Sequence, residues 1–494
     1  LTRPQLPGLL APALTVTEGA ASDVGSAGYA GASGAGLASV AEKTCGIGLG
    51  QALSRRRQQA LAWKRRWSEL RSNASSGFGF VEACGLAYAP KLVADSLHST
   101  KPLSRWEDTG LPANSVGSAP QLPLPNAGAV DATADMLGGV LAAIGLPDGQ
   151  EGFAPLVLLA GHGAQTANNP LQASLDCGAC GGQSGDVNAR VLAHLLNHPA
   201  LRTALAAKGT TIPDDTRFIA GLHNTTTDDV TLYEADIAGT GWGADATRAL
   251  ESLRRALAEA GRRTRAERAP LLGLAHLAAD DAALAQSIRS RANDWAQVRP
   301  EWGLADNAAF IVAPRRRTQR MRLGGRSFLH DYDHRADSEG KVLELIMTAP
   351  MIVTNWINLQ YHASTVDNTR YGSGNKTLHN VVGGRIGVFE GNGGDLRIGL
   401  ALQSLHDGER LRHTPLRLSV FIEAPRKMID RIVDRHDVVR QLVEHGWLHL
   451  LRIDAEQALV EHWTRAGWQQ ASSENDAADA TDEASTPLRA PALI

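Results

Sequence analysis

The chain has 494 residues, 43% of them hydrophobic and 20% charged, which is usual for a soluble globular protein. Its 49 basic and 52 acidic residues give a formal net charge of −3, which argues against a nucleic-acid-binding protein that relies on bulk charge. Four cysteines are too few for a disulfide framework in a chain of this length, so we expect a reducing compartment.

The sequence starts at Leu1, and no charged segment followed by an apolar one opens it, so we expect no signal peptide. We expect this start to be an internal position of a longer protein or of a truncated gene model. Residues 51–73 are predicted to form a helix from the partial helical spacing of Leu and Trp. The basic runs at 55–57 and 64–66 indicate a solvated helix face, with contact to anionic lipid or to a partner as the alternative.

The clearest unit in the sequence is a strand, a loop, a helix and a second strand. Short apolar runs at 154–160 and 218–222 are typical of buried strands, and residues 187–207 between them are predicted to be helical. This order is typical of an α/β domain with a parallel sheet, in which ligands bind at the carboxyl ends of the strands. Polar clusters follow both strands, at 161–169 and 223–229, so we expect a site there.

Further elements are predicted on both sides of this unit. The stretch 342–361 is apolar, but Pro350 and polar residues such as Asn355 interrupt it, so we expect a buried segment and no membrane span. A basic cluster at 254–268 is interpreted as a solvated helix face. The other predicted elements are helices at 129–145, 246–295 and 425–444 and strands at 310–313 and 417–422.

The predicted fold class is α/β, with a mostly parallel sheet flanked by helices and with helical and loop-rich additions. Five regions are expected along the chain. They are an irregular and helical region (1–150), an α/β core (151–235), a charged helical region (236–340), a mixed α/β region (341–460) and a disordered acidic tail (461–494).

The first candidate site is a glycine-rich run that contains His162 and Cys177. Neutral imidazole and thiolate are good zinc ligands, and glycines allow the backbone to approach closely, so we interpret the pair as metal ligands. His162 by itself is more typical of a hydrogen-bonded structural histidine. A redox pair is disfavoured because glycines follow the cysteines and no helix begins there. Further candidates near the site in the same run are Asn168, Asn169, Asp176 and Cys180.

The second candidate site is His223 with the Thr- and Asp-rich residues up to Asp229. Such residues favour helix caps and turns, but they also fit a loop that contacts substrate or supports the metal ligands. Together with Cys177 and Cys180, the histidines His162 and His223 would complete a closed, structural Cys₂His₂ zinc site. A catalytic zinc instead needs an open position, and the spacing alone leaves both sites possible.

A third polar run extends from Trp356 to Asn380 and continues to residue 404. It is typical of loops that pack on a sheet. Its composition also permits anion binding by backbone N–H groups, although no P-loop pattern is present.

These motifs together resemble the DabA family of inorganic carbon transporter subunits. The similarity runs from the opening RPQLP to about residue 455, so it covers most of the chain. The segments that carry it are GHGAQTANNPLQASLDCGACGG, NARVLAHLLN, TRFIAGLHNTTTDDV, WINLQYHASTVDN and YGSGNKTLHNVVGGRIGVFEGNGGDLRIGLALQSLHDG.

The resemblance implies a core like that of β-carbonic anhydrases, with a zinc ion (Zn2+). In the family, a Cys-x-Asp-x-Arg segment supplies a Cys and an Asp ligand, and a later His and Cys complete the site; these two fall on His162 and Cys177. Neither Cys45 nor Cys84 begins such a segment in this sequence. The resemblance therefore places half of the zinc site, and an Asp–Arg pair that controls access to the metal, upstream of this chain.

The resemblance also implies hydration of CO2 to bicarbonate in complex with DabB, a membrane subunit that conducts cations. It implies a peripheral location on the cytoplasmic side of the inner membrane, and the apolar stretch 342–361 is one hypothesis for the contact with that subunit. The present chain alone is expected to be inactive. Two alternatives stay open: a metal-dependent hydrolase whose own site uses Asp228 or Cys180, and a non-catalytic interaction subunit with a structural zinc.

Overall fold

The computed structural model describes residues 49–72, 75–97, 126–146, 152–165, 184–237, 244–294, 302–374, 399–454, 456 and 459–471. The chain divides into two compact units. Unit 1 comprises residues 1–306 and 356–416, and unit 2 comprises residues 307–355 and 417–494. The chain changes unit at three points, and the second of them, between residues 355 and 356, lies inside helix α12 (Pro350–Val366).

Unit 1 contains a three-stranded sheet in the order β1 (Leu156–Gly163), β2 (Arg217–Asn224) and β3 (Asp229–Leu232). β1 and β2 are parallel, as the strand–helix–strand pattern predicts, and β3 runs antiparallel to β2. Side chains alternate between the faces of a strand, and Phe218 and Leu222 face one side while Ile219 faces the other.

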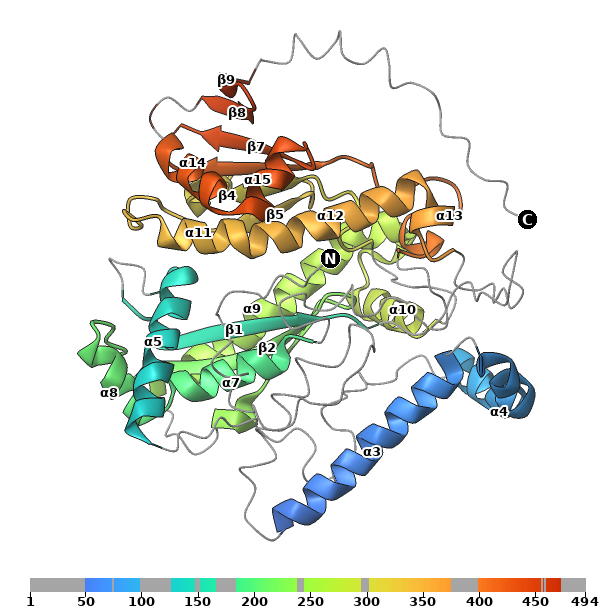
Figure 1. Ribbon diagram of the computed structural model, residues 1–494. Helices are drawn as coiled ribbons and strands as arrows, with labels where there is room; N and C mark the ends of the chain where they lie inside the picture. The colour runs from blue at the N-terminus through green and yellow to red at the C-terminus, as the bar shows by residue number, and fades with distance from the viewer. Residues whose placement is uncertain are drawn as a thin grey trace. The chain divides into compact units, whose positions relative to one another are not determined.

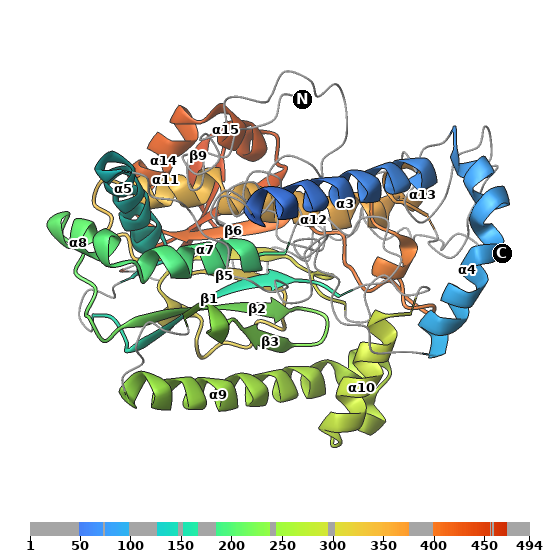
Figure 2. The same cartoon turned by 90° about the horizontal axis from the view of Figure 1, so that it is seen from below.

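Helices cover both faces of this sheet, as Figure 2 shows. On one face, α5 (Ala127–Ala143), α7 (Asp186–Leu196) and α8 (Pro199–Ala207) form an apolar core with Phe218. On the other face, Leu250 of α9 (Ala244–Arg268) packs against Ile219. The layers thus explain why both strands consist of nearly continuous apolar residues.

The helix predicted over 187–207 is two helices, α7 and α8, because Pro199 opens the second one. Asn197 lies at the break and forms two hydrogen bonds with Phe218 of β2, one as donor and one as acceptor. Its Nδ2 donates to the Phe218 carbonyl at 2.7 Å, and its Oδ1 accepts from the Phe218 N–H at 3.0 Å. The break therefore fixes the helices on the sheet.

Unit 1 also contains further helical segments. They are α3 (Leu49–Ser72), α4 (Gly77–Leu97), α10 (Asp281–Ala292) and α13 (Asn368–Tyr371), with 3₁₀ turns η5 (Glu234–Ile237), η6 (Ala269–Leu272), η7 (Ala275–Leu277) and η9 (Leu402–Ser404).

Unit 2 is built on a six-stranded sheet in the order β5-β4-β6-β7-β8-β9. Its first four strands are parallel, and β8 and β9 continue it as antiparallel strands. The strands are β4 (Ala309–Val312), β5 (Ser327–His330), β6 (Leu418–Glu423), β7 (Leu448–Ile453), β8 (Val460–Thr464) and β9 (Gly467–Gln470). The helical segments are η8 (Arg315–Arg317), α11 (Lys341–Thr348), α14 (Arg426–Arg435) and α15 (Asp437–Glu444).

The apolar stretch around residues 342–352 belongs to the core of unit 2. Leu343 and Met347 of α11 and Met351 of α12 are buried with strand residues of the sheet. Among the described residues, Lys341–Val366 is the one stretch long and apolar enough to cross a membrane by length and composition, with a mean hydropathy of 1.4 and half of that window buried. The first half of the stretch Lys341–Val366 is apolar because it packs against the sheet of unit 2.

Three features of the fold differ from the sequence-based expectation. The chain forms two separate mixed sheets, where a single mostly parallel one was expected. The short strands β3, β5, β7, β8 and β9 were not predicted, because runs such as Val460–Thr464 are short, mix polar with apolar residues and depend on pairing with neighbouring strands. The start of the predicted acidic tail, 461–494, contains β8 and β9, and residues 472–494 lie outside the described ones.

A buried carboxylate fastens the antiparallel edge of unit 2. Glu461 of β8 accepts from Arg426 Nε at 2.9 Å and from Arg452 Nη1 at 2.6 Å. The hydrogen bond from Arg426 and that from Arg452 hold the pKa of Glu461 below its usual 4.5, although burial acts in the opposite direction.

We predict that Glu461→Gln lowers the free energy of unfolding at pH 7 by about 2 kcal/mol, the usual value for hydrogen bonds to charged groups. A depressed carboxylate pKa stabilises the fold above the unfolded pKa, and this contribution is lost as the pH falls through the folded pKa. The difference between wild type and variant should therefore shrink below pH 4.5. Urea unfolding over a pH series measures it, and Glu339→Gln, in an exposed pair with Lys341, is the control. A constant difference at all pH values would contradict the assignment.

Candidate functional site

The two polar clusters predicted from the sequence lie side by side at the carboxyl ends of β1 and β2. The strands pair in register, with His162 opposite His223 and Gly163 opposite Asn224. Paired residues of parallel strands point to the same face of a sheet. Ile219 packs toward α9, so His223, four residues further along β2, and its neighbour His162 also lie on the α9 face.

His162 is exposed at the end of β1. The chain returns to it after a long excursion, because the Gly185 N–H donates to the His162 carbonyl at 2.8 Å. Two glycines make this contact possible: a Cβ on Gly161 would lie 2.3 Å from the Gly185 carbonyl carbon. The described residues that flank the segment 166–183 on both sides therefore lie close to His162.

Five of the predicted site residues lie in this segment and outside the described residues. They are Asn168, Asn169, Asp176, Cys177 and Cys180. The structure thus places His162 and His223 together and places the two ends of the segment that carries Cys177 next to them.

The point of return is fixed by a buried polar network at the start of α7. Asp186 accepts from Ser184 Oγ and from the Tyr233 hydroxyl, both at 2.6 Å. Arg190 lies 4.4 Å from the centre of the Tyr233 ring and forms a buried ion pair with Asp236. Burial alone would lower the pKa of Arg190, but the hydrogen bond and charge of Asp236 raise it above its ordinary value. An acidic residue near the start of a helix was the only feature of the sequence that could have indicated this network.

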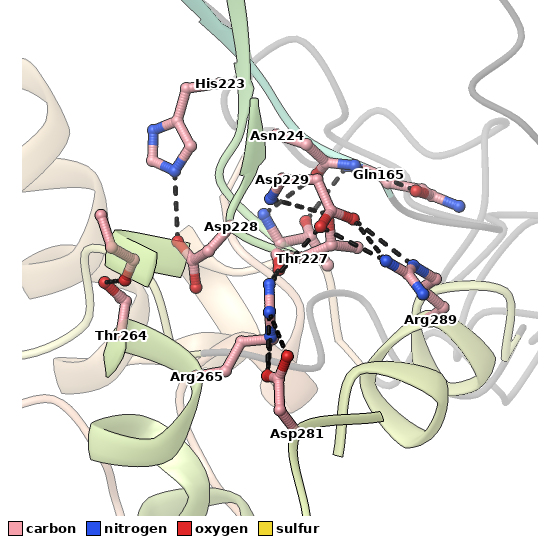
Figure 3. Close-up of polar contacts among 12 residues, drawn as sticks. Gln165, His223, Asn224, Thr227, Asp228, Asp229, Thr264, Arg265, Asp281 and Arg289 are labelled. Carbon is pink, nitrogen blue, oxygen red and sulfur yellow. Dashed lines mark hydrogen bonds and ion pairs between the residues drawn. The ribbon is translucent and has the colours of Figure 1, made fainter. Parts of the chain in front are cut away.

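Side chains and backbone tie the two strand ends together. The Thr225 N–H donates to the Gly163 carbonyl at 2.9 Å, and the Gln165 N–H donates to Thr226 Oγ1 at 3.1 Å. Asn224 Nδ2 donates to Gln165 Oε1 at 3.0 Å, as Figure 3 shows. The cluster 223–229 is therefore a structured turn between β2 and β3, in agreement with the turn interpretation.

Asp228 is the central charge of this turn. It is 5% exposed and has a left-handed backbone (φ +58°), which Asp tolerates better than most residues. Its Oδ1 lies 3.1 Å from His223 Nε2, and Arg268 contacts its Oδ2. An ionised carboxylate only accepts hydrogen bonds, so the proton sits on His223 Nε2, and Nδ1 carries the lone pair in the neutral ring.

Arg265 and Arg268 correct the interpretation of the basic cluster 254–268 as a solvated face. Arg265 is 6% exposed and donates to the Thr227 carbonyl at 3.1 Å and, through Nε, to Asp281 at 3.0 Å. Asp229 accepts from Arg289 at 3.0 Å. The available signal was the pair of acids at 228–229 together with arginines three positions apart on one helix face, which sequence analysis did not connect.

A glycine lets the turn approach α9. A Cβ on Gly261 would lie 2.5 Å from the Asp228 carbonyl oxygen, so only glycine fits at this position. The turn, α9 and α10 thus form one charge-balanced layer beneath the two histidines.

The third polar run also reaches this part of unit 1. Ala401 forms a small buried cluster with Ala164, directly after β1. The Ser373 N–H donates to the Leu400 carbonyl at 3.0 Å, which joins both sides of residues 375–398. Those residues lie outside the described ones.

The described residues contain no group of three His, Cys, Asp or Glu side chains arranged to hold a metal ion. His162 is exposed, and His223 has a carboxylate partner of the kind that metal-binding histidines use. A metal at this point therefore needs further ligands from outside the described residues.

Comparison with known proteins identifies the family. The family model described as "Probable inorganic carbon transporter subunit DabA" matches residues 1–448. The chain belongs to the DabA family. It is 49% identical over 475 residues to the probable inorganic carbon transporter subunit DabA of Ectopseudomonas mendocina, covering 95% of this chain and 54% of that protein.

Other DabA relatives agree with this assignment. The Methylovorus glucosotrophus protein is 48% identical over 95% of this chain and 52% of its own length. The Halothiobacillus neapolitanus protein, named DabA2, is 52% identical over 78% of this chain and 46% of its own length. The chain thus spans about half the length of the curated relatives it matches. No solved structure matches it.

We predict that Asp228→Asn lowers the free energy of unfolding by about 2–3 kcal/mol, because Arg268 loses a buried countercharge while asparagine still accepts the left-handed backbone. Thermal and urea unfolding measure the change. Asp245→Asn, in an exposed pair with Arg248 on the same helix α9, is the control and should change little. Equal stability of the Asp228 variant and wild type would show that the ion pair is dispensable.

Proposed function

We propose that this chain is part of an inorganic carbon uptake system and that His162 and Cys177 are two ligands of a zinc ion that hydrates CO2 to bicarbonate. The family and the names of its relatives support the transport role. The remaining ligands are expected from a Cys-x-Asp-x-Arg segment, which these 494 residues do not contain.

The observation that carries the proposal is the return of the chain to His162. The segment 166–183 begins after Gln165 and ends at the hydrogen bond from the Gly185 N–H to the His162 carbonyl. Both ends of the segment with Cys177 are thereby held at an exposed histidine at the carboxyl end of a parallel strand, where α/β proteins bind their ligands. His and Cys are suitable zinc donors.

The residues around the site have supporting roles in this proposal. When bound, zinc would acidify water so that CO2 is hydrated at neutral pH. Asp228 and Arg268 would hold His223 on the same face as His162, where its Nδ1 is available to the site. The β-carbonic-anhydrase-like core, the membrane subunit DabB and the peripheral position on the cytoplasmic side of the inner membrane are parts of the same proposal.

One observation favours a second candidate, the closed Cys₂His₂ site. His162 and His223 are neighbours in register on one face of the sheet, so Cys177 and Cys180 would complete four ligands around a structural zinc. A self-contained hydrolase site is favoured less, because its proposed ligand Asp228 already accepts from His223 and Arg268.

We predict that zinc binds tightly only to a longer protein that joins the Cys-x-Asp-x-Arg segment to this chain. In that protein, His162→Ala and Cys177→Ala should each reduce the zinc content well below one equivalent. His223→Ala is the matched control, because it removes the same side chain from the neighbouring strand and should leave zinc in place. Metal analysis of purified proteins after dialysis measures the content.

The same experiment distinguishes the second candidate. In the closed site, this 494-residue chain would retain one zinc, and His223→Ala or Cys180→Ala would release it. That result would overturn the proposed ligand set and remove the basis for CO2 hydration at this zinc.

A further inference from the structure

Helix α3 carries a positive charge on a surface that also exposes large apolar side chains. Its 24 residues include seven Arg or Lys and one Glu. Arg56, Trp63 and Leu70 are spaced by seven residues, so they lie along one side of the helix. All three are exposed, and Trp63 is 66% exposed.

Helix α4, which follows α3 directly, is apolar and largely exposed. Leu86 is 91% exposed, and Val81 and Val93 are more than half exposed. This contrasts with α11, whose apolar side chains Leu343 and Met347 are fully buried. Leu86, Val81 and Val93 are therefore not buried in a core formed by the described residues.

The two helices have a small aromatic cluster of their own, and Trp63 stacks at its edge, with its ring centre 6.3 Å from that of Trp67. The rings of Trp67 and Phe80 meet edge to face with centres 5.4 Å apart, and Phe80 also contacts Tyr88 at 5.8 Å. Phe80 is buried, so this cluster holds the pair together. Trp63 stays exposed at the edge of this cluster, and Leu86 and Val93 are exposed as well.

The positive charge of α3 indicates which kind of partner fits the exposed surface of α3 and α4. Two copies of α3 would bring together two strongly basic helices, so self-association through it is disfavoured. Tryptophan is enriched at membrane interfaces, and arginines on the polar side of such a helix bind anionic lipid headgroups. The other long basic helix, α9, does not have this character, because Glu259 pairs with both Arg262 and Arg263.

We propose that the exposed side of α3 and α4 binds the surface of an anionic phospholipid bilayer. Arg55, Arg56 and Arg66 contact the headgroup phosphates, and Trp63 and Leu86 insert at the level of the headgroups. The inference rests on the membrane location in the proposed function and identifies the surface responsible. It does not depend on zinc.

The test is co-sedimentation of the full chain with vesicles of phosphatidylcholine alone or mixed with phosphatidylglycerol. We expect binding to the phosphatidylglycerol vesicles only, and weaker binding at high salt because ions screen the attraction. Each arginine near an anionic membrane contributes about 1 kcal/mol, so Arg55→Gln with Arg56→Gln should weaken binding by more than tenfold. Trp63→Gln and Leu86→Gln should weaken it without changing the salt dependence.

The matched control is Arg262→Gln with Arg263→Gln, which removes the same charge from an adjacent exposed pair on α9. It should bind vesicles like wild type, and circular dichroism confirms that every variant is folded. Absence of vesicle binding, or equal loss in both double variants, would overturn the inference. So would a concentration-dependent dimer in sedimentation analysis that Trp63→Gln abolishes, since it would assign the surface to a second copy. None of these outcomes alters the zinc content, which tests the proposed function separately.

Discussion

The close contact between the end of β1 and the start of α7 is the constraint on which the candidate site depends. A side chain at Gly161 would collide with the Gly185 backbone, and the Gly185 N–H closes the contact on the His162 carbonyl. The residues on both sides of the 18-residue segment 166–183 thereby lie close to His162. The buried Asp186 and Arg190 network anchors the returning side, so the excursion is tied to the sheet at both ends.

The second requirement is charge balance beneath the histidines. The turn after β2 buries Asp228 in a left-handed conformation, which would be costly without a countercharge. Arg268 supplies that charge, and the absence of a side chain at Gly261 lets the turn lie against α9. The long charged helix α9 is thus part of the site. Its Arg268 pairs with Asp228, and Asp228 in turn orients His223. The same logic does not extend to α3, whose exposed arginines and tryptophan are consistent with a partner outside the chain.

Much of the fold was predictable from local patterns. The apolar runs that became β1 and β2, the helix between them and the parallel order follow from hydrophobic spacing and from the rule that consecutive parallel strands need a crossover. The polar clusters after the two strands predicted that His162 and His223 lie at the same edge of the sheet, where the strands pair in register. Short strands such as β8 and β9 were missed because they are five and four residues long, contain few apolar residues, and are stabilised by pairing with neighbouring strands.

The sequence by itself determined the family, the α/β character of the core and the candidate ligands His162 and Cys177, since these depend on residue identity and on spacing along the chain. Only the tertiary structure decided that His162 and His223 are neighbours in register, that Arg265 and Arg268 neutralise the turn, and that the apolar residues of α11 are core while those of α4 are surface. These are contacts between distant segments. Hydrophobicity and charge are properties of single residues, whereas burial and pairing depend on which other segment lies opposite.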